Sequence, residues 1–146
     1  MKKILLTVAL ATATLLGLQS CEKNDEFLAQ ENLPTTSQTF LQENFPTATI
    51  QSVIKEYDDF TYTFKVILSD GTLLEFRKNG EWKEIENRTS GVPTTAIPTK
   101  IVGYLTENYS ANFVVDIEHD RGYDVELDNG LDLDFDSSGN FLRIDL

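Results

Sequence analysis

The sequence is poor in the residue types that most often carry enzyme chemistry. It contains one cysteine, one histidine and no Gly-x-Ser-x-Gly motif. One cysteine can form neither a disulfide within the chain nor a multi-cysteine metal site. The lone His119 stands between Glu118 and Asp120, but acids are so abundant here that this grouping is weak support for a catalytic dyad. We therefore predict a protein that is not an enzyme and has no cofactor and no resident metal.

Basic side chains are also scarce. Lys and Arg number 12 against 24 Asp and Glu, which gives a formal net charge of −12. The excess is uneven, because residues 92–146 carry 3 basic and 11 acidic side chains whereas residues 33–91 carry 6 and 9. An acidic surface repels phosphate backbones, so nucleic-acid binding is disfavoured. No basic patch suits lipid headgroups, so we expect membrane contact through an anchor alone.

The N-terminus has the layout of a bacterial lipoprotein signal. Lys2 and Lys3 precede an apolar run from Ile4 to Leu18, and Ser20-Cys21 follows. This run is short for a membrane span, which needs about 20 residues. We expect residues 1–20 to be removed and Cys21 to be acylated, so that lipid holds the mature protein to a membrane.

Residues 21–32 are polar and are interpreted as a tether. The Lys, Asp and Glu cluster directly after Cys21 resembles the surface-export signal of Bacteroidetes lipoproteins. Polarity that merely keeps a tether soluble would look the same. The expected location is the cell envelope at the outer membrane, and both its periplasmic side and the cell surface remain open.

The rest of the chain contains one unit written twice, which we place at residues 33–91 and 92–146. Leu33-Pro34-Thr35 matches Ile97-Pro98-Thr99 at the start of the unit. Gly80-Glu81-Trp82 matches Gly139-Asn140-Phe141 near its end. Along the sequence, the two glycine-containing segments lie closer together than the two proline-containing segments do. The first copy is therefore slightly longer, and we place its extra residues between its first two strands.

The sequence pattern of each copy predicts one helix followed by four strands. Ile101, Tyr104 and Leu105 recur at helical spacing after a proline, which is tolerated in the first turn of a helix. Alternating apolar and polar residues predict strands around residues 61–68 and 123–128, with further strands near 48–56, 112–119, 81–86 and 140–146. Asp70-Gly71 and Asn129-Gly130 predict two-residue hairpin turns.

A set of turn, helix and core positions in this sequence matches the pattern of a known protein family. It comprises Leu33-Pro34, Phe40-Leu41, Asn44-Phe45-Pro46, Ala48, Ile50, Val66, Leu68, Asp70-Gly71, Glu75-Phe76 and Gly80-Glu81-Trp82. With these residues the chain resembles the PepSY-like, beta-lactamase-inhibitor-like domain of secreted and lipid-anchored Bacteroidetes proteins, over about residues 33–146. The resemblance implies an α+β fold in which two tandem α-β-β-β-β units form one continuous antiparallel sheet, with helices on one face and the other face open. It also suggests inhibition of an envelope peptidase, although the cysteine pairs of secreted beta-lactamase inhibitors are missing.

Alternation places many acids of the second unit on the open face. Asp124, Glu126, Asp132 and Asp134 are the candidate binding residues among them, together with Asp116, Glu118, Asp136 and Asp145. Like charges on neighbouring strands are destabilising. This face is either a docking surface for a basic partner or for Ca²⁺, or a solvated surface relaxed by counterions. The run from Asp132 to Asp136 fails the EF-hand pattern, because Ser137 and Arg143 stand where glycine and glutamate are needed.

Aromatic residues supply the other candidate contacts. Phe141 alternates with Leu142 and Ile144, so we expect Phe141 and the matching Trp82 to point to the open face as partner anchors. The alternative is that both rings fill the seam between the two units. Tyr57 and Phe60, in the longer first hairpin, are further candidates, unless that hairpin is an ordinary turn.

These patterns together predict a lipid-anchored envelope protein that binds a protein or peptide through the open sheet face. The alternative is a structural lipoprotein that responds to calcium or another cation. The sequence alone names no partner.

Overall fold

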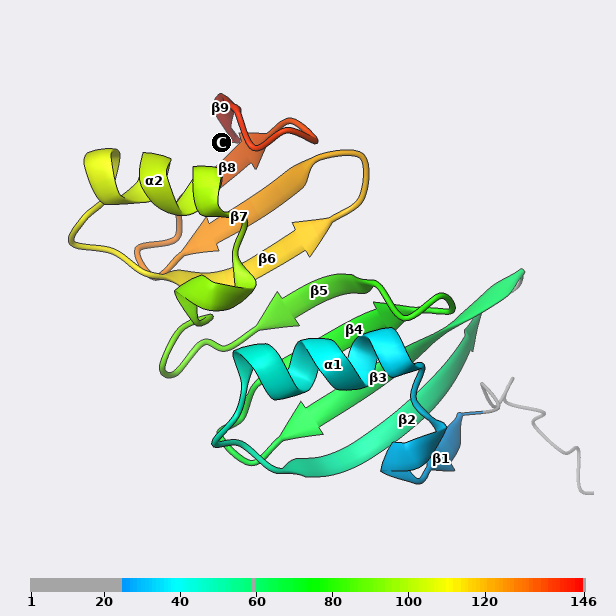
Figure 1. Ribbon diagram of the computed structural model, residues 1–146. Helices are drawn as coiled ribbons and strands as arrows, with labels where there is room; N and C mark the ends of the chain where they lie inside the picture. The colour runs from blue at the N-terminus through cyan, green and yellow to red at the C-terminus, as the bar shows by residue number, and fades with distance from the viewer. Residues whose placement is uncertain (1–24, 59, 146) are drawn as a thin grey trace, which may run out of the picture.

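The computed structural model describes residues 25–58 and 60–145, arranged as nine strands and two α-helices (Figure 1). The predicted signal peptide and the acylation site Cys21 lie outside these residues. The helices are α1 (Thr35–Asn44) and α2 (Thr99–Asn108), and a short 3-10 turn precedes each, at Gln30–Asn32 and Thr94–Ala96. The strands are β1 (Glu26–Leu28), β2 (Ile50–Asp58), β3 (Thr61–Leu68), β4 (Leu73–Arg77), β5 (Trp82–Glu86), β6 (Val114–His119), β7 (Tyr123–Leu127), β8 (Asp132–Phe135) and β9 (Phe141–Asp145).

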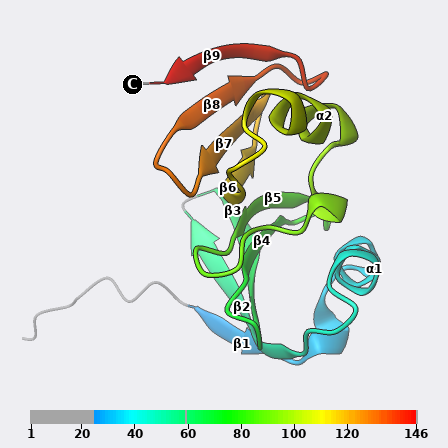
Figure 2. The same ribbon diagram turned by 90° about the vertical axis from the view of Figure 1, so that its left-hand side faces the viewer.

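All nine strands form one antiparallel sheet in chain order from β1 to β9. A helix followed by four strands occurs twice, with β2–β5 after α1 and β6–β9 after α2. Both helices lie on the same side of the sheet, and among the described residues the opposite side carries no helix (Figure 2). The predicted α+β fold with one open antiparallel sheet is therefore confirmed. Within the described ranges, no helix combines the length and apolar character that a bilayer crossing requires.

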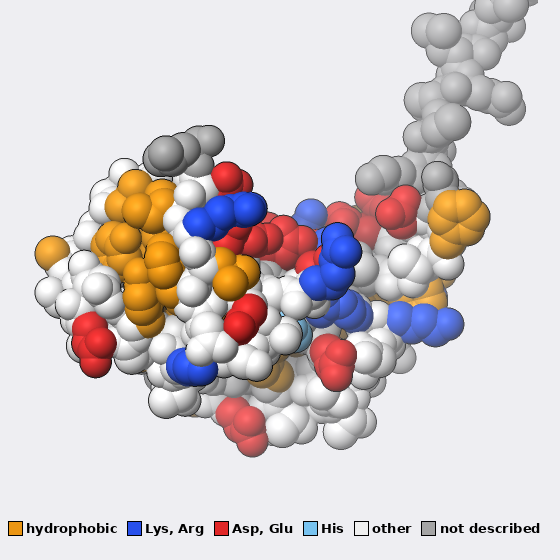
Figure 3. Space-filling model, turned by 90° about the horizontal axis from the view of Figure 1, so that it is seen from above, with side chains coloured by type: hydrophobic (Ala, Val, Ile, Leu, Met, Phe, Trp, Pro, Cys, Tyr) orange, Lys and Arg blue, Asp and Glu red, His pale blue; other side chains and the backbone are white. Residues whose placement is uncertain are grey.

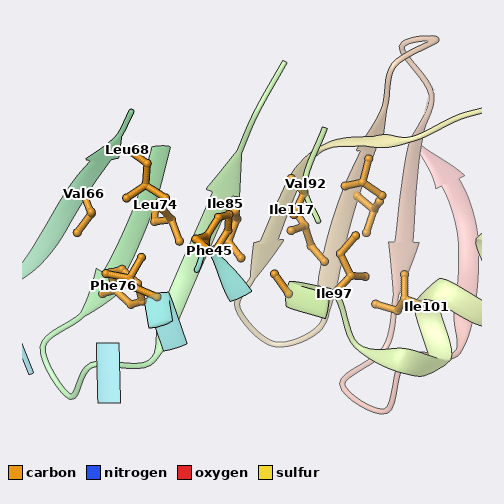
Figure 4. Packing of buried hydrophobic residues seen from close by; sticks show 14 of the residues in the cluster. Phe45, Val66, Leu68, Leu74, Phe76, Ile85, Val92, Ile97, Ile101 and Ile117 are labelled. Carbon is orange, nitrogen blue, oxygen red and sulfur yellow. The ribbon is translucent and has the colours of Figure 1, made fainter. Parts of the chain in front are cut away.

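The core is a single layer between the helices and the sheet. Phe76, Ile85 and Ile117 are fully buried there, and Ile101 of α2 packs into the same cluster. Figure 4 shows these side chains as one row that continues from β3 past the junction of β5 and β6 to α2. At that junction Ile85 pairs directly with Ile117. The two halves of the chain consequently share one core and one sheet.

The structure differs from the tether interpretation of residues 21–32. Glu26–Leu28 form strand β1, in which Phe27 pairs with Ile54 and Leu28 with Val53 of β2. Leu28 packs against the core, so its apolar side chain stabilises a strand within a mostly polar segment. Only the residues before β1 remain candidates for a tether.

The hairpin turns also differ from the prediction. Leu68 bonds to Thr72 across a loop of three residues, 69–71, rather than two. In that loop only Gly71 has a positive φ, of 86°. A three-residue loop with glycine in its last position is the second common hairpin solution, and it needs only one residue in the left-handed region. Gly130 occupies the same place in the β7–β8 loop, with φ 79°.

Candidate binding face

The open face is the side of the sheet opposite the helices. Its charged side chains form two rows across the strands, which we call the first and the second ladder. The first ladder runs through paired residues from β3 to β9, in the order Lys65, Glu75, Glu84, Glu118, Asp124, Asp134 and Arg143. The second ladder runs in the order Ile67, Leu73, Glu86, Asp116, Glu126, Asp132 and Asp145. Each ladder therefore places five acids on five consecutive strands. The four predicted acidic candidates, Asp124, Glu126, Asp132 and Asp134, all lie in these ladders.

Like charges on adjacent strands repel, and a few basic side chains offset part of that cost. Arg88 is the most important of them, because its guanidinium donates two hydrogen bonds to Glu126, at 2.9 and 2.8 Å, and another to Glu86 at 2.8 Å. Lys83 lies 3.3 Å from Glu75, and Arg143 lies 2.6 Å from Asp134. The first ladder is thus flanked by cations, while the middle of the face remains acidic.

The most crowded carboxylates lie where β5 meets β6. Oxygen atoms of Glu84, Glu86 and Asp116 all lie within 4.8 Å of one another. Burial, followed by the negative charges of Glu84 and Glu86, raises the pKa of Asp116 to about 7. Burial and the neighbouring Glu75 also raise the pKa of Glu84. Three carboxylates at this separation can hold a divalent cation, and without one the group favours a bound proton.

Asp124 extends the same effect toward β9. Burial, followed by the negative charge of Asp134 and a hydrogen bond that the protonated Asp124 carboxyl donates to Asp134, raises the pKa of Asp124. Asp136 has a different role from the one expected, because it closes the β8–β9 loop. Its carboxylate accepts hydrogen bonds from the backbone N–H groups of Ser138 at 2.9 Å and Asn140 at 2.8 Å, and Asn140 lowers its pKa. Asp136 therefore stabilises a turn.

The expected orientation of Trp82 and Phe141 is wrong. A β-bulge in β5 pairs Trp82 with Phe76 and Glu75 with Glu84, so Lys83 is an extra residue. One extra residue moves the preceding side chain to the other face, because side chains alternate in a strand. Trp82 consequently packs on the helix side against Phe40, with ring centroids 6.3 Å apart.

The same irregularity occurs in β9. Phe141 pairs with Phe135, and its ring stacks on Tyr104 of α2 at a centroid distance of 4.6 Å. Leu142, expected on the helix side, is instead 61% exposed. Phe141 therefore packs beneath α2 and is not a free anchor on the open face.

Trp82 does lie at the seam between the two units, as the alternative interpretation held. Its ring is 5.3 Å from that of His119 in β6 and 6.1 Å from that of Tyr123 in β7. His119 stacks on Tyr123 at 4.5 Å, and burial, followed by the charge of Arg77, lowers the pKa of His119. The only histidine of the sequence is thus part of an aromatic cluster that joins the two halves.

The first hairpin keeps its exposed aromatic residues. Phe60, near the tip between β2 and β3, is fully exposed, and Tyr57 is 39% exposed. A groove of about 820 Å³ begins beside this hairpin, and its walls include Tyr57, Thr61, Glu75, Arg77 and Lys83. The groove therefore brings the basic residues Arg77 and Lys83 to this end of the open face, in contrast to the acidic ladders, whereas Tyr57 pairs with Tyr62, which packs against the core on the helix side.

Sequence reasoning missed several members of the face. Glu84 and Glu86 were not among the candidates, although their alternation with the apolar Ile85 was the signal that could have placed both on the open face. Apolar residues three positions apart in one strand, such as Trp82 and Ile85, were the available signal for a bulge. Arg88 lies beyond β5, and only the folded sheet brings it to Glu126.

Solved structures from Bacteroides vulgatus share this fold. A "putative periplasmic protein" is 34% identical, with a TM-score of 0.79, over 86% of this chain and 99% of that chain. A second, described as a "putative periplasmic protein of unknown function", is 36% identical, with a TM-score of 0.77, over 84% of this chain and 99% of that one.

A third solved structure comes from Bacteroides thetaiotaomicron and is described as a "putative calcium-regulated periplasmic protein". It is 32% identical, with a TM-score of 0.79, over 84% of this chain and 97% of that chain. No curated protein matches the chain. None of these descriptions names an enzymatic activity.

The family model described as "Putative beta-lactamase-inhibitor-like, PepSY-like" matches residues 62–143, which extend from β3 to β9. The matched segment includes every acid of the two ladders except Asp145. Together with the similarity to the Bacteroides structures, this match assigns the protein to the PepSY-like, beta-lactamase-inhibitor-like family.

Proposed function

We propose that the protein is a lipid-anchored protein of the cell envelope whose open face binds a basic segment of a protein or peptide. The signal sequence and Cys21 support the anchor, and the description of three relatives as periplasmic supports the compartment. The five peptide units from Cys21 to Glu26 reach at most about 18 Å, so an anchored sheet stays close to its membrane. A Cys21→Ser variant should move from the membrane fraction to the soluble fraction.

The arrangement of the two ladders is the observation that carries the binding proposal. Ten acids lie on adjacent strands, and the described part of the chain offsets them with only a few cations. A basic segment that lies across the strands would replace repulsion between neighbouring carboxylates with attraction, and it would be steered to this face by its charge. The exposed Phe60 at the tip of the first hairpin and the groove beside that hairpin can add contacts that do not depend on charge. The family description suggests one class of partner, an envelope peptidase with a basic rim.

A charge-matched pair of double variants tests this proposal. In one, Asp124→Asn and Asp132→Asn remove two charges from the open face. In the other, Glu43→Gln and Glu107→Gln remove two charges from exposed positions on α1 and α2. We expect a hexalysine peptide to bind the second variant like the natural chain and the first at least tenfold more weakly, as measured by calorimetry at constant ionic strength. An equal loss in both variants would attribute binding to net charge and contradict a specific role of the open face.

A second candidate function is calcium binding at Glu84, Glu86 and Asp116. Their convergence within 4.8 Å favours it, and so does the description of the Bacteroides thetaiotaomicron relative as calcium-regulated. Carboxylate oxygens are the preferred ligands of Ca²⁺. Arg88 lies 4.0 Å from Asp116, so an ion there would have to share this carboxylate with a guanidinium.

Thermal unfolding in millimolar Ca²⁺ at constant ionic strength tests the calcium proposal. A ligand that binds only the folded state at a hundred times its Kd stabilises it by about 2.7 kcal/mol, which raises the Tm by several degrees. We expect Glu84→Gln to abolish the rise and Asp120→Asn, an exposed change in the β6–β7 turn, to keep it. An unchanged Tm of the natural chain would reject this second function and leave the first proposal intact.

A further inference from the structure

The described sheet has two edges, and they differ in length. Strand β1 has three residues, Glu26–Leu28, whereas β9 has five, Phe141–Asp145. An uncovered edge presents backbone N–H and C=O groups that can pair with another strand. The edge at β9 therefore offers the longer template for strand addition.

Strand β5 is the counterpart of β9 in the first half of the chain, and its outer edge is covered by a neighbouring strand. Both β5 and β9 are the fourth strand after a helix, and Ile85 of β5 corresponds to Ile144 of β9 when the Gly80 and Gly139 segments are aligned. Ile85 is completely buried because β6 lies beside it and Ile117 pairs with it. Ile144 is 40% exposed, and Leu142 near it is 61% exposed. Ile144 therefore occupies the position that is buried at the β5–β6 junction, but no strand of the described residues lies beside β9 to cover it.

The surface around this edge is apolar. Figure 3 looks down on the end of the molecule formed by α2 and β9, and hydrophobic side chains gather on that end. Phe141 and Tyr104, which stack on each other, belong to the hydrophobic layer that reaches this edge. Burial of such a layer against a second sheet edge would add hydrophobic stabilisation to the backbone hydrogen bonds.

We propose that β9 pairs with β9 of a second copy of this chain, antiparallel and about a two-fold axis at Ile144. The order Arg143-Ile144-Asp145 makes this register self-complementary, since reversal places each Arg143 opposite the copy's Asp145. On the helix side, Ile144 would meet Ile144 of the copy, as Ile85 meets Ile117 at the β5–β6 junction. The axis is perpendicular to the sheet, so the helices of both copies lie on the same side.

Charge favours a second copy over an unrelated strand. Asp145 pairs with Asp132 on its own sheet, which is a like-charge pair at the end of the second ladder. The copy's Arg143 would lie beside that pair and offset its repulsion. Arg143 itself is 69% exposed beyond its contact with Asp134, so it can reach a second carboxylate. An arbitrary peptide would satisfy the backbone but would not provide this matched pair of charges.

Reversal of single charges tests the register. Sedimentation of the chain from residue 22 onward, from micromolar to millimolar concentration, should detect a reversible dimer. Arg143→Asp alone and Asp145→Arg alone each create like-charge pairs across the axis, so each should weaken the dimer at least tenfold. An equimolar mixture of the two variants restores opposite charges at both positions and should form a heterodimer. Arg121→Asp, at a fully solvated turn position, should leave the dimer unchanged.

Three results would overturn the proposal. They are a natural chain that remains monomeric at millimolar concentration, single variants that dimerise like the natural chain, and a mixture that fails to associate although both variants unfold at the natural Tm. A chain that remains monomeric but incorporates an added strand peptide at β9 would identify a peptide-binding edge instead. The test does not depend on the open face, so its outcome is separate from that of the hexalysine experiment.

Discussion

Replacement of Asp116 by asparagine should stabilise this protein, and the gain should depend on pH. The side chain of Asp116 is only 18% exposed, and it shares the β5–β6 junction with Glu84 and Glu86. These surroundings raise its pKa from 3.8 to about 7. Because the folded state binds the proton more tightly than the unfolded state, stability falls as pH rises from about 4 to about 7. Asparagine keeps the shape of the side chain and removes this loss.

The magnitude follows from the difference between the two pKa values. A shift of about three units corresponds to at most about 4 kcal/mol, at 1.36 kcal/mol per unit. Arg88 and solvent at the open face screen part of this, so we expect Asp116→Asn to gain about 2 kcal/mol at pH 8. The gain should shrink as pH falls through 7 and vanish below about pH 4, where aspartate is neutral in both states.

Urea unfolding monitored by the fluorescence of Trp82 measures this effect at pH 8 and pH 5. Asp132→Asn is the matched control, because Asp132 lies in the same ladder but is exposed. The control should change stability by less than about 0.5 kcal/mol, as surface substitutions usually do. A gain for Asp116→Asn that is absent at pH 8, or that stays constant between pH 8 and pH 5, would refute the electrostatic argument.

Three further substitutions test the packing. Trp82→Ala should lower the free energy of unfolding by about 3 kcal/mol in urea titrations followed by circular dichroism, because the ring joins both halves of the core. Asn87→Ala should cost about 2 kcal/mol in the same assay, since it removes a buried amide that donates to Thr72 at 2.9 Å. Gly80→Ala should be clearly more destabilising than Gly71→Ala: both have positive φ, but a Cβ at Gly80 would lie 2.7 Å from a Pro34 carbon and one at Gly71 meets nothing within 4 Å. Equal costs for the two glycines would show that the packing against α1 does not matter.

Local patterns were sufficient to predict most of the fold. Helical spacing after Pro34 and Pro98 located α1 and α2, because amphipathic periodicity and proline preference act within a few residues. Alternation located the central strands and placed Asp124 and Asp134 on the open face, where they lie. The role of these acids in binding remains a prediction.

The errors occurred where a non-local pairing overrides the local period. The bulges in β5 and β9 moved Trp82 and Phe141 to the helix side, because pairing with Phe76 and Phe135 buries both rings in the core. Strand β1 formed in a mostly polar segment because β2 offered it an edge. A short sequence window around β1 does not show this, since α1 separates β1 from β2 along the chain.

The sequence by itself determined the order of elements, the acidic excess of residues 92–146 and the lipoprotein-like N-terminus, because composition and short-range periodicity encode all three. Only the tertiary structure decided which acids face one another. Glu84 and Glu86 come from β5 and Asp116 from β6, two strands that α2 separates along the chain, and burial together with the crowding of these carboxylates raises the pKa of Asp116 to about 7. The order of the strands in the sheet also decided that Ile85 is buried and Ile144 is exposed, because β6 lies on the outer side of β5 and no strand of the described residues lies on the outer side of β9.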